Sequence, residues 1–174
     1  DYINGGDLRY HIGKRRKFTE VETKFFVACI VLSLQYLHTN RVIHRDIKPE
    51  NLVLEPRVRE ANRFGHFSGV EIGNANDTSG TPGYMAPEVM CRKNHSYCVD
   101  FFALGVMCYE FMLGRRPYIG KNRKEIRDQI LSKQVEVKPE DTKELVTLGV
   151  DFVNKLLIRN PHYRLGADGI DELK

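Results

Sequence analysis

The chain has 174 residues, of which 41% are hydrophobic, and its 27 basic and 23 acidic side chains give a formal net charge of +4. This length is sufficient for one domain with a sizeable core, and a small, dispersed charge argues against a nucleic-acid-binding protein. No apolar run approaches the roughly 18 residues of a membrane-spanning helix, so we expect neither nucleic acid nor membrane as a partner.

The first predicted elements are a turn and two helices. The chain opens with the letters DYINGGDL, which predict a short strand, a Gly-Gly turn and a helix that buries Leu8 and Ile12. A longer helix is expected to begin at Thr19, because Thr19 and Glu22 have the spacing of a capping box. It extends through about His38, which we interpret as a helix-end residue and not as a ligand. The apolar residues that recur at helical spacing are Phe25, Phe26, Cys29, Ile30, Leu32, Leu34 and Leu37.

The next stretch, residues 44–51, reads HRDIKPEN and lies between two short apolar runs. Charged and polar groups between such runs predict a loop displayed on a rigid scaffold, and Pro49 prevents a helical continuation. The string resembles the catalytic loop of eukaryotic protein kinases. A lysine two residues after the aspartate is typical of the serine/threonine form.

The resemblance implies a part in phosphoryl transfer for several residues of this loop. Asp46 is expected to accept or orient the substrate hydroxyl proton, Lys48 to neutralise charge beside the transferred phosphate, and Asn51 to bind a magnesium ion. His44 and Arg45 are expected to be structural. In the family, the arginine that matches Arg45 is the usual partner for a negative charge on the activation segment.

The resemblance also extends to the nucleotide and to the substrate. The opening letters resemble the kinase hinge, so ATP and Mg2+ are the implied cofactors, with Asp7, Asn51 and Val53 at the nucleotide. Asp7, Glu50 and Glu110 match three acids that line the peptide groove of kinases selecting basic substrates. We therefore expect protein substrates with basic residues near the phosphorylated serine or threonine. For Glu110 alone, a surface or ion-pair role is an equal alternative.

The stretch from 57 to 76 departs from the family pattern. The family places Asp-Phe-Gly here, and its aspartate holds magnesium. Phe64 and Gly65 stand nearly where expected, but Arg63 occupies the position of the aspartate. A guanidinium repels a cation, so we expect weak magnesium and ATP binding. Asn62 supplies a neutral oxygen only in a shifted register, and the stretch itself predicts an irregular loop.

The letters DTSGTPGYMAPE at 77–88 resemble the end of the kinase activation segment. Thr81 matches the residue that hydrogen-bonds the aspartate and lysine of the catalytic loop. Asp77 stands where related kinases carry a phosphorylated threonine. Two interpretations remain open: Asp77 is a built-in charge for Arg45, or Thr78 or Ser79 is phosphorylated and Asp77 is a solvated loop residue.

Three helices are predicted beyond this segment. Residues 99–114 are apolar almost all round, which predicts a buried helix that ends at Gly114. Residues 121–133 and 145–158 show the periodicity of amphipathic helices.

Three charged residues in this part of the chain are expected to be buried and therefore to need partners. By resemblance, Asp100 holds the backbone of the catalytic loop. Arg164 matches the arginine that forms a buried pair with the glutamate of Ala-Pro-Glu, which is Glu88 here.

These observations predict a mainly helical fold, with at most a short antiparallel pair of strands near the catalytic loop. Residues 1–174 resemble the hinge and C-terminal lobe of the α+β kinase fold, closest to the AGC or AGC-like group. The domain is expected to be partial, truncated at both ends and without its N-terminal lobe. Four cysteines without a C-x-x-C pair predict reduced thiols and a cytoplasmic protein.

Three functional interpretations follow. The chain is part of an active serine/threonine kinase, as the residues of its catalytic loop indicate. Alternatively, it is a pseudokinase that binds partners through the helical surfaces at 86–113 and 121–133, as Arg63 suggests. The third interpretation is a truncated product without activity, which the irregular stretch would explain.

Overall fold

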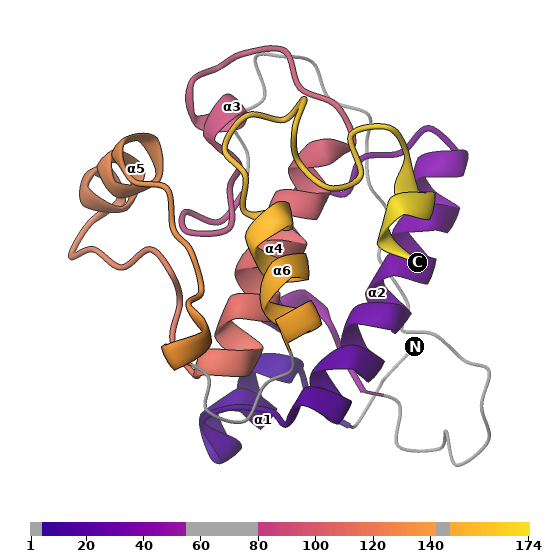
Figure 1. Cartoon of the computed structure of the whole chain (residues 1–174), viewed down its shortest axis with the longest axis vertical. Coiled ribbons are helices and arrows are strands. Elements are labelled where there is room, and N and C mark those ends of the chain that lie inside the picture. Colours follow the sequence, from indigo (N-terminus) through magenta and orange to yellow (C-terminus); the bar gives the residue numbers. More distant parts are fainter. Residues whose placement is uncertain (1–4, 55–79, 142–146) are drawn as a thin grey trace.

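The computed structural model describes residues 5–54, 80–141 and 147–174, and within these ranges the chain is mainly helical (Figure 1). The elements are, in chain order, α1 (Leu8–Arg15), α2 (Glu20–Thr39), η1 (Pro49–Asn51), α3 (Pro87–Met90), α4 (Cys98–Leu113), α5 (Arg123–Ser132), η2 (Pro139–Asp141), α6 (Thr147–Leu156) and η3 (Ile170–Leu173), where η marks a 3-10 helix. The expected first strand, the stretch 57–76 with Arg63, and the residues 77–79 lie outside the described residues.

Among the described residues no β-strand is present, so the pair of strands expected beside the catalytic loop is not confirmed. One isolated antiparallel bridge joins Asp7 to Val53. Its flanking hydrogen bonds run from Leu8 N to Leu52 O (2.9 Å) and from Leu54 N to Gly6 O (3.0 Å). The chain that leaves the loop therefore pairs with the Gly-Gly turn, and this pairing brings the start of α1 beside the loop.

Helix α4 forms the core of the lobe, because its side chains are apolar on almost every side. All of its residues except Leu113 are buried, and both α2 and α6 pack against it (Figure 1). Gly114 ends the helix in the left-handed conformation, at φ +70°, and its N–H donates to Glu110 O at 2.8 Å. The predicted helix and its glycine stop are confirmed.

Helix α2 begins where the capping box predicts. The Thr19 side chain accepts a hydrogen bond from Glu22 N, and the Glu22 side chain accepts from Thr19 N at 3.0 Å. Only one face of the helix is buried, because Phe25 and Leu32 are 63% and 44% exposed although they share the apolar periodicity. The apolar pattern is therefore wider than the contact with α4.

The remaining helices agree in kind with the predictions and differ at their ends. Helix α5 starts two residues later than predicted, because the Asn122 side chain accepts from Glu125 N at 2.9 Å and caps it. Helix α6 is described from Thr147, since residues 142–146 lie outside the described ranges. Leu8 and Ile12 of α1 are buried as predicted. In the described part of the chain, no helix is both long and apolar enough to cross a membrane.

Candidate active site

Three of the residues singled out in the sequence surround the carboxylate of a fourth, Asp46. Its Oδ1 accepts hydrogen bonds from Thr81 Oγ1 (2.8 Å) and Thr81 N (3.1 Å). Its Oδ2 lies 2.7 Å from Lys48 Nζ and 3.0 Å from Asn51 Nδ2. Lys48 Nζ also donates to Thr81 Oγ1 at 2.7 Å. Two segments that are far apart in the chain therefore share one charged cluster.

The electrostatics of this cluster keep Asp46 ionised. Burial alone would raise the pKa of Asp46, but the hydrogen bonds from Lys48, Thr81 and Asn51 outweigh it, so the pKa lies below its ordinary value. The carboxylate remains partly accessible, with 34% of its side chain exposed. Asp46 can thus accept a further hydrogen bond from a hydroxyl group outside the protein.

A second carboxylate, that of Asp100, positions the loop from within the core. Asp100 lies in the first turn of α4 and is completely buried. It accepts from His44 N at 2.9 Å and from Arg45 N at 2.7 Å. These bonds hold Arg45 in a left-handed conformation, at φ +67°, which a non-glycine residue adopts only at a cost of about 1–3 kcal/mol. The following residue, Asp46, is thereby turned toward Thr81.

Two histidines complete the support of the loop. His38, which we interpreted as a helix-end residue, places Nε2 2.8 Å from Asp100 Oδ2. His44 accepts a hydrogen bond from Asp46 N at Nδ1, at 3.3 Å. Burial lowers the pKa of His44 below its ordinary value, although the carboxylates of Asp100 and Asp46 act in the opposite direction. The contact between His38 and Asp100 was not predicted, because the apolar periodicity of the sequence shows only that His38 lies near the end of α2.

The segment that carries Thr81 docks on the lobe through a buried ion pair. Arg164 donates to both oxygens of Glu88, at 2.6 and 3.0 Å, and their side chains are 0% and 5% exposed. The same guanidinium donates to three backbone carbonyls and lies over the ring of Phe102. Every part of the Arg164 head group thus has a partner, which a buried cation requires.

A third group of charges surrounds Arg9, which the sequence did not single out. Arg9 Nε donates to Glu50 Oε1 at 2.7 Å, and its terminal nitrogens donate to Glu110 Oε1 (2.6 Å) and Oε2 (3.1 Å). The Tyr84 hydroxyl lies 2.5 Å from both Arg9 and Glu110. Asp7, the third predicted acid, caps α1 by accepting from Tyr10 N at 2.7 Å.

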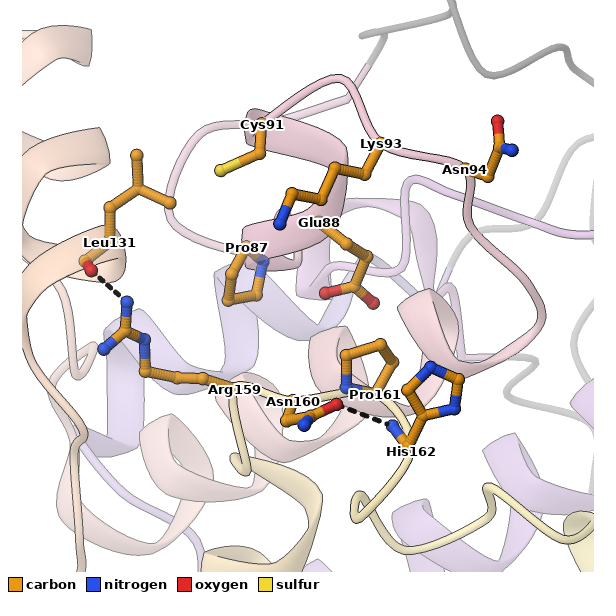
Figure 2. Close-up of a pocket in the computed structure, with 10 residues that line it drawn as sticks. All are labelled: Pro87, Glu88, Cys91, Lys93, Asn94, Leu131, Arg159, Asn160, Pro161 and His162. Carbon is orange, nitrogen blue, oxygen red and sulfur yellow. Dashed lines mark hydrogen bonds between the residues drawn. The ribbon is translucent and has the colours of Figure 1, made fainter.

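A cavity of about 440 Å3 lies beside Glu88 (Figure 2). Pro87 and Glu88 of α3 face Asn160, Pro161 and His162 across it. Two hydrogen bonds stiffen its rim, from an Arg159 nitrogen to Leu131 O and from His162 N to Asn160 Oδ1. The lining contains none of the residues around Asp46, so this cavity is separate from the charged cluster.

Asn51 is the described residue that the resemblance assigns to a magnesium ion. Within the described ranges, no group of three or more histidine, cysteine, aspartate or glutamate side chains gathers as a metal site. Asn51 directs Nδ2 at Asp46, so a cation would be held by its other amide atom, Oδ1. Arg63, which we expect at the position of the metal-binding aspartate, lies outside the described residues.

Comparison with known proteins gives one family. The model of the protein kinase domain matches residues 1–173. The chain is 36% identical to the serine/threonine-protein kinase Sgk1 of Homo sapiens, over all of the chain and 40% of that protein. It is 36% identical to protein kinase C-like 1 of Caenorhabditis elegans, over 95% of the chain and 24% of the relative. It is 34% identical to cAMP-dependent protein kinase catalytic subunit 3 of Drosophila melanogaster, over all of the chain and 30% of the relative.

Proposed function

The chain belongs to the protein kinase family, with serine/threonine kinases as its relatives, and from that premise we propose that it forms the catalytic lobe of a protein serine/threonine kinase. It spans between 24% and 40% of the length of the three curated relatives above. The proposed reaction, carried out by the complete protein, is transfer of the γ-phosphate of ATP to a serine or threonine hydroxyl. The observation that carries the proposal is the cluster of Asp46, Lys48, Asn51 and Thr81.

In this proposal, each member of the cluster has its own part. Asp46 accepts the hydrogen bond of the substrate hydroxyl and orients its oxygen toward the phosphate. Lys48 lies between Asp46 and Thr81, where its positive charge stabilises negative charge that develops on the transferred group. Thr81 fixes the direction of both side chains, since it accepts from one and donates to the other.

For the nucleotide, we propose a site at the edge where Asp7 bridges to Val53, next to Asn51. ATP and magnesium supply the phosphoryl group and the charge neutralisation of the reaction when bound. We propose that these 174 residues alone bind them weakly, because Asn51 is the one magnesium ligand that both the resemblance and the described residues provide, and Arg63 replaces the other.

For the substrate, we propose a protein segment with basic residues near its serine or threonine. Glu50 adjoins Asn51 in η1, and Tyr84, which contacts Glu110, follows Thr81 by three positions. This face of the lobe therefore combines the Asp46 cluster with negative charge. A cytoplasmic setting is part of the proposal, because all four cysteines are free thiols.

The test is phosphotransfer from ATP to a serine peptide, measured with protein expressed from the complete transcript and with its Asp46→Asn variant. Because the variant loses the acceptor of the hydroxyl proton, we expect kcat to fall by about 10²- to 10⁴-fold. Circular dichroism of both proteins checks that folding is unchanged. Equal activity of the two proteins, or no activity in either, would reject the proposed function.

A further inference from the structure

Arg9 sits in a site built for a guanidinium. The side chain of Glu110 is 6% exposed and presents both oxygens to Arg9, while Glu50 accepts from Nε on another edge of the same group. The Tyr84 hydroxyl accepts from Arg9 and donates to Glu110. This arrangement matches the planar, forked donor set of arginine, which a lysine ammonium cannot reproduce.

The site lies beside the cluster around Asp46. Glu50 belongs to the same turn, η1, as Asn51, which donates to Asp46. Tyr84 belongs to the same turn as Thr81, whose backbone carbonyl accepts from Tyr84 N at 3.1 Å. A peptide that places its hydroxyl at Asp46 therefore has neighbouring residues within reach of this site.

We propose that Arg9 is a specificity-determining residue, whose guanidinium fills an arginine-binding site that Glu50, Glu110 and Tyr84 would otherwise offer to the substrate. This inference rests on the proposed function, because it assigns a substrate to the face that carries Asp46. The inference limits the proposed preference for basic substrates. The negative charge of this face still attracts basic peptides, but the site of Glu50, Glu110 and Tyr84 does not select an arginine.

The charges of the site explain why Arg9 stays in place. Burial disfavours the charged guanidinium, but hydrogen bonds to Glu110 and Glu50 outweigh it and raise the pKa of Arg9. If Arg9 left without a replacement, Glu110 would be a nearly buried carboxylate without its cation, which is strongly unfavourable. An external arginine must therefore displace an internal one that is already attached to the protein.

The experiment uses the 174-residue chain and needs no catalysis, so its failure is distinct from failure of the proposed function. Fluorescence anisotropy measures the Kd of serine peptides that carry either arginine or alanine at each position before the serine. At the position where Arg9→Ala gains selectivity, we expect arginine and alanine peptides to bind the wild type within about 3-fold of each other. With Arg9→Ala, we expect the arginine peptide to bind at least about 10-fold more tightly at one position.

A second measurement tests whether the site emptied by removing Arg9 accepts a guanidinium from solution. The melting temperature of Arg9→Ala is measured with and without N-ethylguanidinium, which can occupy the emptied site. We expect the ion to raise the Tm of Arg9→Ala and to leave the wild type unchanged. Arg15→Ala is the matched control, because Arg15 lies on the same helix and pairs with Glu22 away from this site; the ion should not stabilise it.

Two outcomes would overturn the inference. One is a wild type that prefers arginine as strongly as Arg9→Ala does at the same peptide position, and the other is an Arg9→Ala variant that gains neither peptide selectivity nor stabilisation by N-ethylguanidinium. An Arg9→Ala variant too unstable for the peptide assay is still tested by the recovery of its Tm.

Discussion

The orientation of Asp46 depends on a carboxylate in the core and not on its own neighbours alone. Asp100 accepts from the backbone of His44 and Arg45, and these bonds offset the cost of burying its charge. The strained backbone of Arg45 is maintained by the same bonds. The site that faces solvent is therefore fixed by polar contacts that water does not reach, as preorganised sites require.

His44 makes the stability of the fold depend on pH. Its pKa in the folded chain lies below the value of about 6.5 expected when unfolded. As pH falls below about 6.5, the unfolded chain binds this proton first, so the free energy of unfolding decreases until the folded pKa is reached. Protonation at Nδ1 would also remove the acceptor of Asp46 N.

We expect His44→Asn to weaken this dependence. Between pH 7.5 and 5.5, the wild type should lose more stability than the variant, because the variant lacks the group whose pKa is lowered on folding. Urea denaturation of both proteins at the two pH values measures the difference, and the other histidines cancel because both chains contain them. An equal loss of stability in the wild type and in His44→Asn would contradict the role of His44 in the pH dependence.

At the residue scale, sequence motifs predict the members of the site better than their partners. Asp46, Lys48 and Asn51 lie within one short string and Thr81 lies in a second, and the resemblance of both strings to kinase motifs was sufficient to propose a cluster. Arg9 was missed, because its partner Glu110 is 101 positions away and no periodicity links them. Such contacts depend on how the helices pack, which local patterns do not encode.

Among the elements, the short helix α3 is joined to the rest of the lobe by a buried ion pair, beside the buried side chains of Pro87 and Val89. Arg164 follows α6, so its bonds to Glu88 join the segment after Thr81 to the end of the chain. Neither charge is exposed to more than a trace of water. Removing one partner therefore leaves the other buried and unpaired.

Replacing Glu88 by glutamine should lower the free energy of unfolding by about 3–5 kcal/mol, because the amide cannot balance the buried guanidinium. The matched control is Asp151→Asn, which breaks the exposed pair of Asp151 and Lys155 on α6. That change should cost about 0.5 kcal/mol or less. Chemical denaturation compares the three proteins, and equal stability of Glu88→Gln and Asp151→Asn would show that burial does not strengthen the pair.

The helices were predictable from periodicity and caps, whereas the expected pair of strands is not confirmed among the described residues. Thr19 and Gly114 mark helix ends through local chemistry that the sequence displays. The start of α5 was placed too early because Asn122 was not recognised as its cap. We expected the apolar run after the loop to belong to a pair of strands, but among the described residues it pairs with the Gly-Gly turn. Such a long-range pairing cannot be predicted from the alternation of apolar and polar residues alone.

For the molecule as a whole, α4 connects the separate parts of the site. Its first turn carries Asp100, which holds the loop of Asp46, and its last turn carries Glu110, which holds Arg9. Between them, Gly105 faces α6: an added Cβ would lie 2.8 Å from Leu156 Cβ and 3.3 Å from Leu157 Cδ2. The close approach of α4 and α6 therefore requires the absence of a side chain at this position.

Gly105→Ala should separate α4 from α6 and lower the free energy of unfolding by about 1–3 kcal/mol, the usual cost of overpacking. Gly13→Ala is the matched control, because nothing lies within 4 Å of a Cβ added there in α1. Alanine at position 13 should stabilise the helix by about 0.5–1 kcal/mol, since it restricts the unfolded chain without a clash. Thermal and urea denaturation should thus show changes in stability of opposite sign for the two variants, relative to the wild type.

Because α4 holds both Asp100 and Glu110, hydrogen exchange in Gly105→Ala should also rise at His44 and Arg45, whose amides donate to Asp100. Unchanged exchange at these amides in a destabilised Gly105→Ala would mean that α4 positions the loop independently of its packing on α6.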